Sequence, residues 1–426
     1  MSISRISKTW NLNNSFIYDN NMKNLPLKVD IVIFGGGIAG LWIFNRLRNA
    51  GYQAILLESH ALGSGQTIKS QGIIHGGLKY ALTGFLNASA NAVEDMPKRW
   101  KDCLAGTGEI DLRSVNVLSH EQLLWSTGSL GSEIAGFFAS KSLNSRVKKL
   151  DKRLYPSVLQ NPSFKGHVYR LEEVVLDTVS LIDTLAKPHQ DFIFKINPHE
   201  GYAFTIDPEC KDKISSVEIR SGQETLSLQA ERYLFTAGEG NEQLSLCLAH
   251  PPVMQRRPLQ MLVAKFKTHY PFFGHCIDTG MNPRITITTH PTQDDQSVWY
   301  LGGQIAEDGV NRSPEKQIAI AKKELNSLLP WLEMETVEWR SFFINRAEPA
   351  QPGGKRPDSV SLTAIENVLV AWPTKLALSP LLADQVIAKL KQQAVQASSP
   401  SENVLRSCSI LEKPRIALAV WDELFQ

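Results

Sequence analysis

Three side chains of this 426-residue chain are of types that can act on a small charged molecule. An imidazole titrates near neutral pH, so His75 could take up a proton during a reaction. The planar guanidinium of Arg346 could bind a carboxylate or a phosphate through two parallel hydrogen bonds. Lys375 could bring a full positive charge to a site where negative charge develops. These three residues are therefore the first candidates for catalysis.

Each of the three residues also has a structural interpretation. His75 could simply pack or form hydrogen bonds within the fold. Arg346 could form a salt bridge with Glu348, which follows two residues later. Lys375 could be an ordinary solvated lysine at a helix start, although the positive end of the helix dipole disfavours a lysine there. Residue type alone leaves these alternatives open.

The strongest structural pattern lies near the N-terminus. An apolar run over residues 29–34 predicts a buried parallel strand and leads directly into Gly-Gly-Gly-Ile-Ala-Gly at 35–40. Residues 41–47 predict a helix, and residues 54–57 predict a second strand that ends at Glu58. This order of strand, glycine-rich turn, helix, strand and acidic residue is typical of a dinucleotide-binding βαβ unit.

Each residue type in this motif has a physical role. Gly35 permits the tight turn, Gly37 lets the backbone approach a pyrophosphate, and Gly40 lets the helix pack closely on the strand. The N-terminus of the helix offers free N–H groups to the phosphates. Glu58 can accept hydrogen bonds from both ribose hydroxyls and would repel a 2′-phosphate, which disfavours NADP. The motif alone does not distinguish FAD from NAD.

Four further segments favour FAD. Small and hydroxyl residues at 63–67 suit a loop that wraps over phosphates and ribityl, and the glycine-rich stretch 70–80 could pass close to a planar ring. Residues 233–238 predict a strand that ends in a small-residue turn. Residues 368–375 predict a strand and a turn, followed by a helical pattern from Leu376 to Leu390.

Together these segments resemble the D-amino-acid oxidase superfamily of FAD enzymes, which includes glycerol-3-phosphate dehydrogenase, L-2-hydroxyglutarate dehydrogenase and glycine oxidase. The stretch SQGIIHGGLKY, residues 70–80, is similar to the IHGGLRY-type stretch of FAD-linked glycerol-3-phosphate dehydrogenases. It also resembles the SGVIH stretch of L-2-hydroxyglutarate dehydrogenases. The resemblance extends from residue 29 to about residue 390 and follows the order of the family's motifs.

The resemblance implies a mixed α/β fold in which a Rossmann-type FAD-binding domain is interleaved with an antiparallel-sheet substrate domain. The expected ranges are 29–100, 168–250 and 345–395 for the FAD-binding domain, 101–167 and 251–344 for the substrate domain, 1–28 for an N-terminal extension and 396–426 for a C-terminal tail. Residue patterns independently predict strands at 260–267 and 298–301 and a helix at 317–329.

The resemblance also implies the site residues. The expected cofactor-binding residues are Gly35, Gly37, Ile38, Ala39, Gly40, Glu58, Ser64, Gly65, Gln66, Thr67, Gln71, Gly72, Ile73, Ile196, Ala237, Gly238, Pro373, Thr374, Lys375 and Leu376. The expected substrate-binding residues are Lys79, Tyr80, Gln304 and Arg346, with Arg356 as a substitute for Arg346.

Two departures from the family pattern bear on these roles. Residues 373–376, Pro-Thr-Lys-Leu, replace the family's GKLT-type turn, which contacts the flavin. Lys79 replaces an arginine that helps to bind a phosphate in the related dehydrogenases, so the charge is kept and the planar fork is lost. If the substrate is an alcohol, the resemblance places His75 in the active site as a candidate general base.

Composition restricts the remaining possibilities. The formal net charge of +2 gives no overall attraction for nucleic acid, and no basic stripe interleaved with aromatic residues is present. Five cysteines, none in a CxxC pair, predict neither a disulfide framework nor a cysteine zinc site, and the histidines lack zinc-ligand spacing, so we expect no metal. No apolar run reaches the length of about 18 residues that a spanning helix needs. We expect a cytoplasmic protein, with peripheral membrane contact left open.

These observations predict an FAD-dependent oxidoreductase that oxidises a small anionic substrate, a 2-hydroxy acid or a polyol phosphate, by hydride transfer to flavin N5. Its electron acceptor would be a quinone or O2. The alternatives are an amino-acid or secondary-amine oxidase or dehydrogenase on the same fold, and a flavoprotein with a binding or assembly role. An NAD-dependent enzyme is disfavoured by the segments after residue 60.

Overall fold

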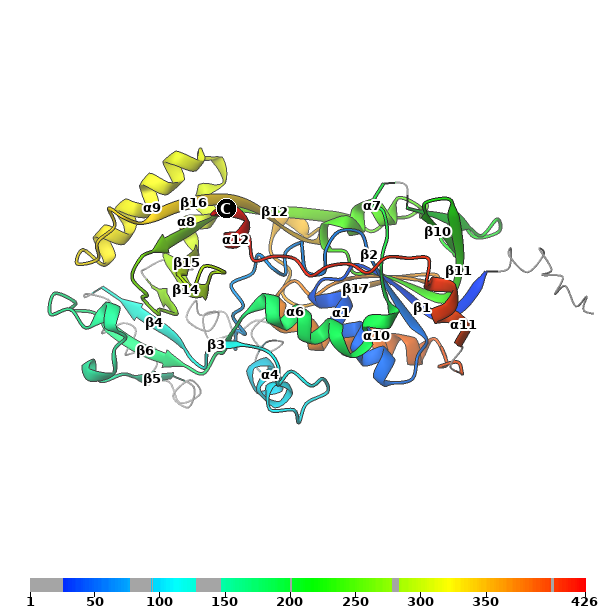
Figure 1. Ribbon diagram of the computed structural model, residues 1–426, viewed down its shortest axis with the longest axis horizontal. Helices are drawn as coiled ribbons and strands as arrows, with labels where there is room; N and C mark the ends of the chain where they lie inside the picture. Colours follow the sequence, from blue (N-terminus) through cyan, green and yellow to red (C-terminus); the bar gives the residue numbers. More distant parts are fainter. Residues whose placement is uncertain are drawn as a thin grey trace, which may run out of the picture.

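The computed structural model describes residues 26–76, 93, 95–127, 147–199, 201–277, 283–399 and 402–426 (Figure 1). Two eight-stranded sheets lie next to each other along the long axis of the molecule. The sheet that contains β1 is on the right in Figure 1, and the sheet that contains β14 and β15 is on the left. The mixed α/β fold predicted from the sequence is confirmed.

The first sheet has a parallel centre. Its strand order is β17-β18-β11-β1-β2-β8, and β10 and β9 extend it from β11. The strands are β1 Leu27–Phe34, β2 Ala54–Glu58, β8 Ile193–Lys195, β9 Tyr202–Ile206, β10 Ile214–Ser221, β11 Glu224–Phe235, β17 Ser361–Ile365 and β18 Val368–Trp372. Four pairs are parallel: β1 with β2, β1 with β11, β2 with β8, and β11 with β18. The continuous apolar runs of these strands are buried on both faces, as parallel strands require.

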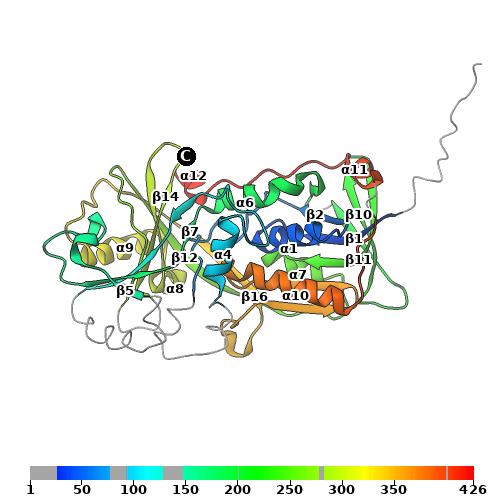
Figure 2. The ribbon, with the colours of Figure 1, turned by 90° about the horizontal axis from the view of Figure 1, so that it is seen from below.

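Helices cover one face of this sheet. Helix α1 (Ile38–Asn49) packs between α6 (Thr178–Ala186) and α10 (Ser379–Gln392), as Figures 1 and 2 show. Helix α4 (Met96–Leu104) adds Trp100, whose ring centroid lies 4.6 Å from that of Trp42 on α1. The same apolar core therefore joins segments that are far apart in the sequence.

The second sheet is antiparallel except for one pair, β13 with β4. Its strand order is β16-β12-β15-β14-β13-β4-β6-β5. The strands are β4 Gln122–Ser126, β5 Val147–Lys149, β6 His167–Leu171, β12 Met254–Phe266, β13 Gly274–Cys276, β14 Ile285–Pro291, β15 Ser297–Gly302 and β16 Glu338–Pro349. Helix α9 (Pro314–Leu328) packs on this sheet through buried residues that include Ala321 and Leu325.

Two of the expected domain boundaries do not coincide with the limits of the sheets. The division into domains stays a prediction. Strand β6 belongs to the second sheet although the boundary was expected at residue 168. Strand β16 continues in the second sheet to Pro349, five residues beyond 344, because its pairing with β12 runs without interruption from Glu338 to Pro349.

The smaller elements lie between these strands or follow the last of them. They are β3 Val117–Ser119, β7 Val175–Leu176, α7 Asn241–Ser245, α8 Gln304–Asp308, α11 Glu402–Cys408 and α12 Val420–Leu424. The 3-10 helices are Lys152–Leu154, Ser157–Leu159, Lys187–Phe192, Gly238–Gly240, Gly309–Asn311, Pro352–Gly354 and Leu376–Leu378. The helix expected from Leu376 thus begins as a 3-10 turn, and the α-helix starts at Ser379, followed by Pro380, whose fixed φ suits the first turn of a helix.

The segment from α11 to α12 runs along the first sheet towards the second (Figure 1). Leu62 donates its N–H to the Arg415 carbonyl oxygen over 2.8 Å and accepts the Ala417 N–H over 3.0 Å. At the far end the buried Trp421 donates its indole N–H to the Pro291 carbonyl oxygen of β14 over 2.9 Å. The segment that was expected to be a tail therefore contacts both sheets.

Candidate functional site

A cavity of about 1160 Å³ lies at the carboxyl ends of the parallel strands, where ligands bind in open α/β sheets. Its wall includes the last residues of β1 and β2 and residues just after β8, β11 and β18, and strands β12 and β16 of the second sheet close it from the other side. The predicted cofactor residues that line it are Gly35, Gly37, Ile38, Ala39, Glu58, Ser64, Gly65, Gln66, Thr67, Gln71, Ile196, Ala237, Gly238, Pro373, Thr374, Lys375 and Leu376. Most of the sequence-predicted residues are thus brought to one place.

The glycine-rich turn has room only for glycine at its critical positions. Gly35 has φ +106°, and a Cβ there would lie 2.6 Å from the Cα of Ala237. A Cβ on Gly40 would lie 1.9 Å from the Gly35 carbonyl oxygen, so Gly40 supports the turn from behind rather than lining the cavity. Gly37 is the N-cap residue of helix α1 and lines the cavity. Because glycine has no side chain, its backbone faces the cavity. This is a cradle into which a pyrophosphate fits.

Glu58 is held at the end of β2 by two backbone donors. Its Oε2 accepts the Gly36 N–H over 2.6 Å, and its Oε1 accepts the His60 N–H over 2.8 Å. Each carboxylate oxygen can accept more than one hydrogen bond. The buried carboxylate therefore keeps acceptor capacity at the cavity wall, as recognition of ribose hydroxyls requires.

The opposite wall of the cavity contains an irregular turn. Thr374 has φ +59°, a left-handed conformation that is unusual for a residue other than glycine, and its hydroxyl donates to the Ser359 carbonyl oxygen over 3.0 Å. The Lys375 N–H donates to the Pro373 carbonyl oxygen over 2.7 Å, and the residue is only 8% exposed. Lys375 is therefore not an ordinary solvated lysine.

Arg346 lines the same cavity from β16. It lies opposite Arg257 of β12, and one of its terminal nitrogens lies 3.3 Å from Oε1 of Glu307. Burial lowers the pKa of Arg346, and the nearby Arg257 lowers it further, while Glu307 raises it. Glu348 pairs with Arg257, so the expected alternative of an Arg346–Glu348 salt bridge is wrong.

The other predicted substrate residues are placed differently. Gln304 is not among the described residues that line the cavity; it begins α8, and its side-chain amide donates to Asp308 over 2.7 Å. Lys79 and Tyr80 lie outside the described residues.

His75 belongs to a segment that leads from the cavity to the second sheet. Gly72 has φ +70°, and a Cβ there would lie 2.0 Å from the Leu176 carbonyl oxygen, so only glycine fits. Ile73 pairs with Val175. The described lining of the cavity does not include Gly72, Ile73 or His75, whereas Gln71 does line it. The amide of Gln71 donates to the Tyr300 carbonyl oxygen over 2.9 Å, which fixes this segment on β15.

Two neighbours of His75 were not predicted. Glu173 lies 3.4 Å from Nδ1 of His75, and the ring of His275 stacks at a centroid distance of 5.8 Å. His275 is buried, and its Nδ1 lies 2.8 Å from the hydroxyl of Thr286. No local pattern connects the three residues, because about 100 residues separate each from the next in the chain.

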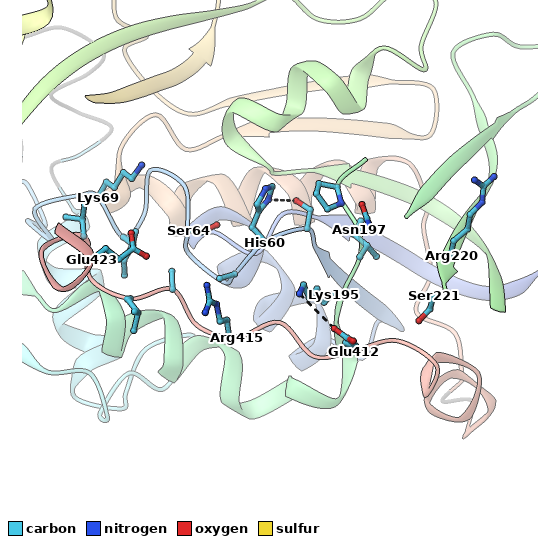
Figure 3. A pocket seen from close by; sticks show the side chains of 18 of the residues that line it. His60, Ser64, Lys69, Lys195, Asn197, Arg220, Ser221, Glu412, Arg415 and Glu423 are labelled. Atoms are coloured by element: carbon cyan, nitrogen blue, oxygen red, sulfur yellow. Dashed lines mark hydrogen bonds and ion pairs between the residues drawn. The ribbon is translucent and has the colours of Figure 1, made fainter. Parts of the chain in front are cut away.

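A second cavity, of about 770 Å³, adjoins the first (Figure 3). The two share Ser59, His60, Ser64, Lys69, Ile196 and Pro198 in their walls. Arg415 and Glu412 of the C-terminal segment complete the second wall, where Glu412 lies 3.9 Å from Lys195. The C-terminal segment thus shapes the surroundings of Glu58 and its neighbours.

Helices long and apolar enough to cross a membrane are absent from the part of the chain that the structure describes.

The sequence also matches a known protein family. Residues 30–349 match the family described as FAD dependent oxidoreductase. The chain belongs to this family. The predicted resemblance to the D-amino-acid oxidase superfamily is confirmed, and the protein is an FAD-dependent oxidoreductase. The glycine cradle, the fixed Glu58 and the long cavity all fit FAD.

Individual relatives agree with this assignment. The chain is 45% identical, over 94% of its length and 99% of the relative's, to a probable FAD-dependent oxidoreductase, PA4991, of Pseudomonas aeruginosa. The crystal structure of that protein superposes with a TM-score of 0.80 at 40% identity, covering 94% of this chain and 99% of the other.

Two more distant solved structures share the fold. An L-alpha-glycerophosphate oxidase of Mycoplasma pneumoniae with FAD bound has a TM-score of 0.61 at 14% identity, covering 89% of this chain and 98% of the other. A glycine oxidase of Geobacillus kaustophilus has a TM-score of 0.59 at 14% identity, covering 92% of this chain and 100% of the other. Since one is named for an alcohol substrate and the other for an amine, the fold alone does not assign the substrate class.

Proposed function

We propose that the enzyme oxidises a small anionic substrate, a 2-hydroxy acid or a polyol phosphate, by hydride transfer from a substrate carbon to flavin N5. The observation that supports this proposal is the pair of cationic side chains, Arg346 and Lys375, in the wall of the cavity that also holds the cofactor-binding residues. Bound FAD would supply the two-electron acceptor, and the protein would orient the substrate and stabilise charge.

Arg346 binds the acidic group of the substrate in this proposal. A guanidinium has five N–H donors, and the contacts with Glu307 and the Arg257 carbonyl oxygen leave donors for a ligand. Because Arg346 is largely buried, an anion beside it is screened less by water than at an exposed arginine. The carboxylate or phosphate would therefore fix which end of the substrate faces the flavin.

Lys375 stabilises the negative charge that arrives during reduction. Its side chain is buried, and its backbone is held by the turn over residues 373–375. A preorganised positive charge in a buried site favours a developing negative charge without further reorganisation.

His75 takes the proton of the substrate hydroxyl. As the hydride leaves the carbon, the hydroxyl oxygen must lose its proton for a carbonyl group to form, and a side chain that titrates near neutrality suits this step. Electrons then pass from the reduced enzyme to a quinone or to O2.

The test is anaerobic bleaching of the visible flavin absorption band of the purified enzyme by a panel of small acids. The panel contains 2-hydroxy acids, glycerol 3-phosphate, amino acids and N-methyl amino acids. Bleaching by a hydroxy acid or polyol phosphate is the expected result. Bleaching by amino acids or secondary amines alone would assign the enzyme to the amine-oxidising alternative and overturn the proposal.

A second measurement distinguishes an enzyme from a flavoprotein that binds or assembles with a partner. If the bleaching substrate loses its effect when Arg346 is replaced by alanine while FAD stays bound, Arg346 serves catalysis. If no acid bleaches the wild-type flavin, the proposal fails.

A further inference from the structure

Three ionisable side chains converge where the segment that carries His75 meets the second sheet. They are His75, Glu173 and His275, and one donor or acceptor atom of each lies within 4.8 Å of those of the other two. Glu173 and His275 are buried, and the side chain of His75 is 19% exposed. His75 is thus the most exposed of the three side chains.

The carboxylate of Glu173 holds both the backbone and the imidazole of this segment. Its Oε1 accepts the Gly76 N–H over 2.6 Å, and its Oε2 lies 3.4 Å from Nδ1 of His75. The neighbouring Ile74 N–H donates to the Val174 carbonyl oxygen over 2.9 Å. Glu173 therefore faces His75 from a rigid frame, and one ring nitrogen of His75 is directed to the carboxylate.

Residues of β13 and α4 also lie beside this group. His275 faces His75 from β13, with an angle of 28° between the ring planes, and a protonated imidazole on each side would place two positive charges beside one carboxylate. From α4 the neighbour of Gly76 is Pro97, which carries no charge. Nδ1 of His275 faces the hydroxyl of Thr286, which fixes the orientation of that ring.

We infer that Glu173 is a positioning residue for His75: it orients the imidazole through Nδ1 and stabilises its protonated form, so that Nε2 accepts the proton of a substrate alcohol. This inference rests on the proposed function and deepens it, because an alcohol needs a base of this kind whereas an amine can lose its proton before it reacts. A carboxylate that holds the far nitrogen of a histidine fixes its tautomer and raises its basicity.

In the proposed reaction the substrate loses one hydride and one proton. The substrate carbon loses a hydride, which carries two electrons to the flavin, and the substrate hydroxyl loses its proton to Nε2 of His75. The carbon–oxygen single bond becomes a carbonyl double bond. Glu173 remains ionised throughout and compensates the positive charge that forms on His75.

Glu173→Gln tests this role with little change of shape. The amide oxygen of glutamine can still accept the Gly76 N–H, while the negative charge beside His75 is lost. Glu172→Gln is the matched control, because Glu172 is the adjacent glutamate, is mostly exposed and lies 3.7 Å from Lys101. Both variants should bind FAD and melt close to the wild type.

The first readout does not depend on a substrate. The pKa of His75 is measured by NMR on the FAD-loaded enzyme with isotope-labelled histidine, and the signal is assigned with His75→Gln. Glu173→Gln should lower the pKa of His75, because the protonated form loses its counter-charge, and Glu172→Gln should leave it unchanged. An unchanged His75 titration in Glu173→Gln would overturn the inference whatever the substrate is.

The second readout is the pH profile of flavin reduction by the substrate found in the bleaching panel. The base must be neutral to act, so the acid limb of the profile should move to lower pH in Glu173→Gln. The plateau rate should fall, by less than the factor of about 10²–10⁴ expected when the base itself is removed in His75→Gln. Equal rates and profiles in Glu173→Gln and the wild type would contradict the inference.

A metal assay completes the test, because two histidines and a glutamate can also bind zinc. About one zinc ion per chain, lost in Glu173→Gln, would overturn the inference, whereas a protein without metal supports it. If the His75 titration shifts as expected but no alcohol bleaches the flavin, the proposed substrate class fails and the pairing of Glu173 with His75 stands. The two failures are thus distinguishable.

Discussion

Arg346 lies opposite Arg257 on the paired strands β16 and β12, and its Nε donates to the Arg257 carbonyl oxygen over 3.2 Å. The two guanidinium groups have separate carboxylate partners, Glu307 for Arg346 and Glu348 for Arg257. Each guanidinium of this strand pair therefore has its own carboxylate, and Lys375 adds a further cationic side chain to the cavity wall. In the proposed mechanism, an anionic substrate that approaches Arg346 competes with Glu307 for its guanidinium.

Replacing Arg346 with glutamine should weaken substrate binding. Loss of a charge-assisted hydrogen bond costs about 1.5–3 kcal/mol, which corresponds to a decrease of roughly 10- to 100-fold in kcat/KM, mostly as a higher KM. The kcat/KM of Arg346→Lys should lie between those of the wild type and Arg346→Gln, since lysine keeps the charge and loses the planar fork. Steady-state kinetics with the panel substrate measures both variants.

The control for these variants is Arg340→Gln on the same strand. The Nε of Arg340 donates to the Leu424 carbonyl oxygen, and its guanidinium lies over the ring of Phe425, away from the cavity wall. Its kinetics should match the wild type. An equal rise of KM in Arg340→Gln and Arg346→Gln would show that Arg346 acts through general stability and not through the anion.

Lys375→Gln should make the flavin harder to reduce. In the proposed mechanism the buried ammonium favours the reduced, more negative flavin, so its removal should shift the reduction potential to more negative values. For a two-electron couple, each tenfold loss of stabilisation corresponds to about 30 mV. Spectroelectrochemistry measures the shift, and Lys391→Gln, on the exposed side of α10, is the control. Equal reduction potentials in the wild type and Lys375→Gln would show that Lys375 does not stabilise the reduced flavin.

Gly40→Ala should abolish or strongly weaken FAD binding. The added methyl group would lie 1.9 Å from the Gly35 carbonyl oxygen and 2.7 Å from the hydroxyl of Thr236, so helix α1 must move away from β1. Overpacking of this kind typically costs about 1–3 kcal/mol of stability. Flavin content and thermal melting measure the effect.

The control adds one heavy atom at the exposed end of the same helix. Ala50→Ser lies at the C-cap of α1, where surface substitutions usually change stability by less than about 0.5 kcal/mol. A Gly40→Ala protein that keeps full flavin content and the wild-type melting temperature would contradict the close packing described for the turn.

The sequence predicted the first sheet's central elements well because their signals are local. The apolar run of β1, the glycine turn and Glu58 lie within about 30 residues, and each residue type has a geometric reason to be where it is. The start of α10 was misplaced by three residues, since the helical pattern continues through the 3-10 turn at Leu376–Leu378. The extension of β16 to Pro349 was missed because pairing with a distant strand, not local pattern, determines where it ends.

The candidate site was only partly predictable for the same reason. Most of the cofactor-binding residues follow directly from local motifs and line one cavity. Glu173, His275 and Glu307 are single residues without a motif, and each reaches its partner through the pairing of strands or segments far apart in the chain. Gln304 was expected to bind the substrate, yet its amide donates to Asp308 and it is not among the described residues that line the cavity.

Trp421→Ala should destabilise the protein and free the C-terminal segment. The buried indole packs against His290, with ring centroids 4.4 Å apart, and donates to the Pro291 carbonyl oxygen. Truncation of a buried tryptophan costs about 3–5 kcal/mol. Thermal melting should fall, and limited proteolysis should cut near α12 first. Trp421→Phe keeps most of the packing and should be affected much less; equal effects of both variants would argue against packing as the cause.

His290 predicts a specific acid sensitivity. Burial lowers its pKa to about 3, whereas an imidazole in the unfolded chain binds a proton near pH 6.5. Below about pH 6.5 the unfolded chain therefore takes up a proton that the folded protein does not. Because of this difference, the free energy of unfolding decreases as the pH falls from 6.5 towards 3, by up to about 1.4 kcal/mol per pH unit.

His290→Gln removes this acid-sensitive contribution. The fall in melting temperature between neutral and mildly acidic pH should be smaller in His290→Gln than in the wild type. His120→Gln, at an exposed position, is the control and should behave as the wild type. A wild-type pH dependence of the melting temperature in His290→Gln would show that another group causes the loss of stability at acidic pH.

The order of strands in the two sheets has a consequence for how this protein can be divided. The chain passes from one sheet to the other after β2, β6, β11 and β16, and the segment from α11 to α12 then joins them again. No continuous stretch of the described chain contains all the strands of one sheet and none of the strands of the other. A nicked molecule should therefore remain one particle until it is denatured, and neither half can be expressed as an independent module from one continuous stretch of the gene.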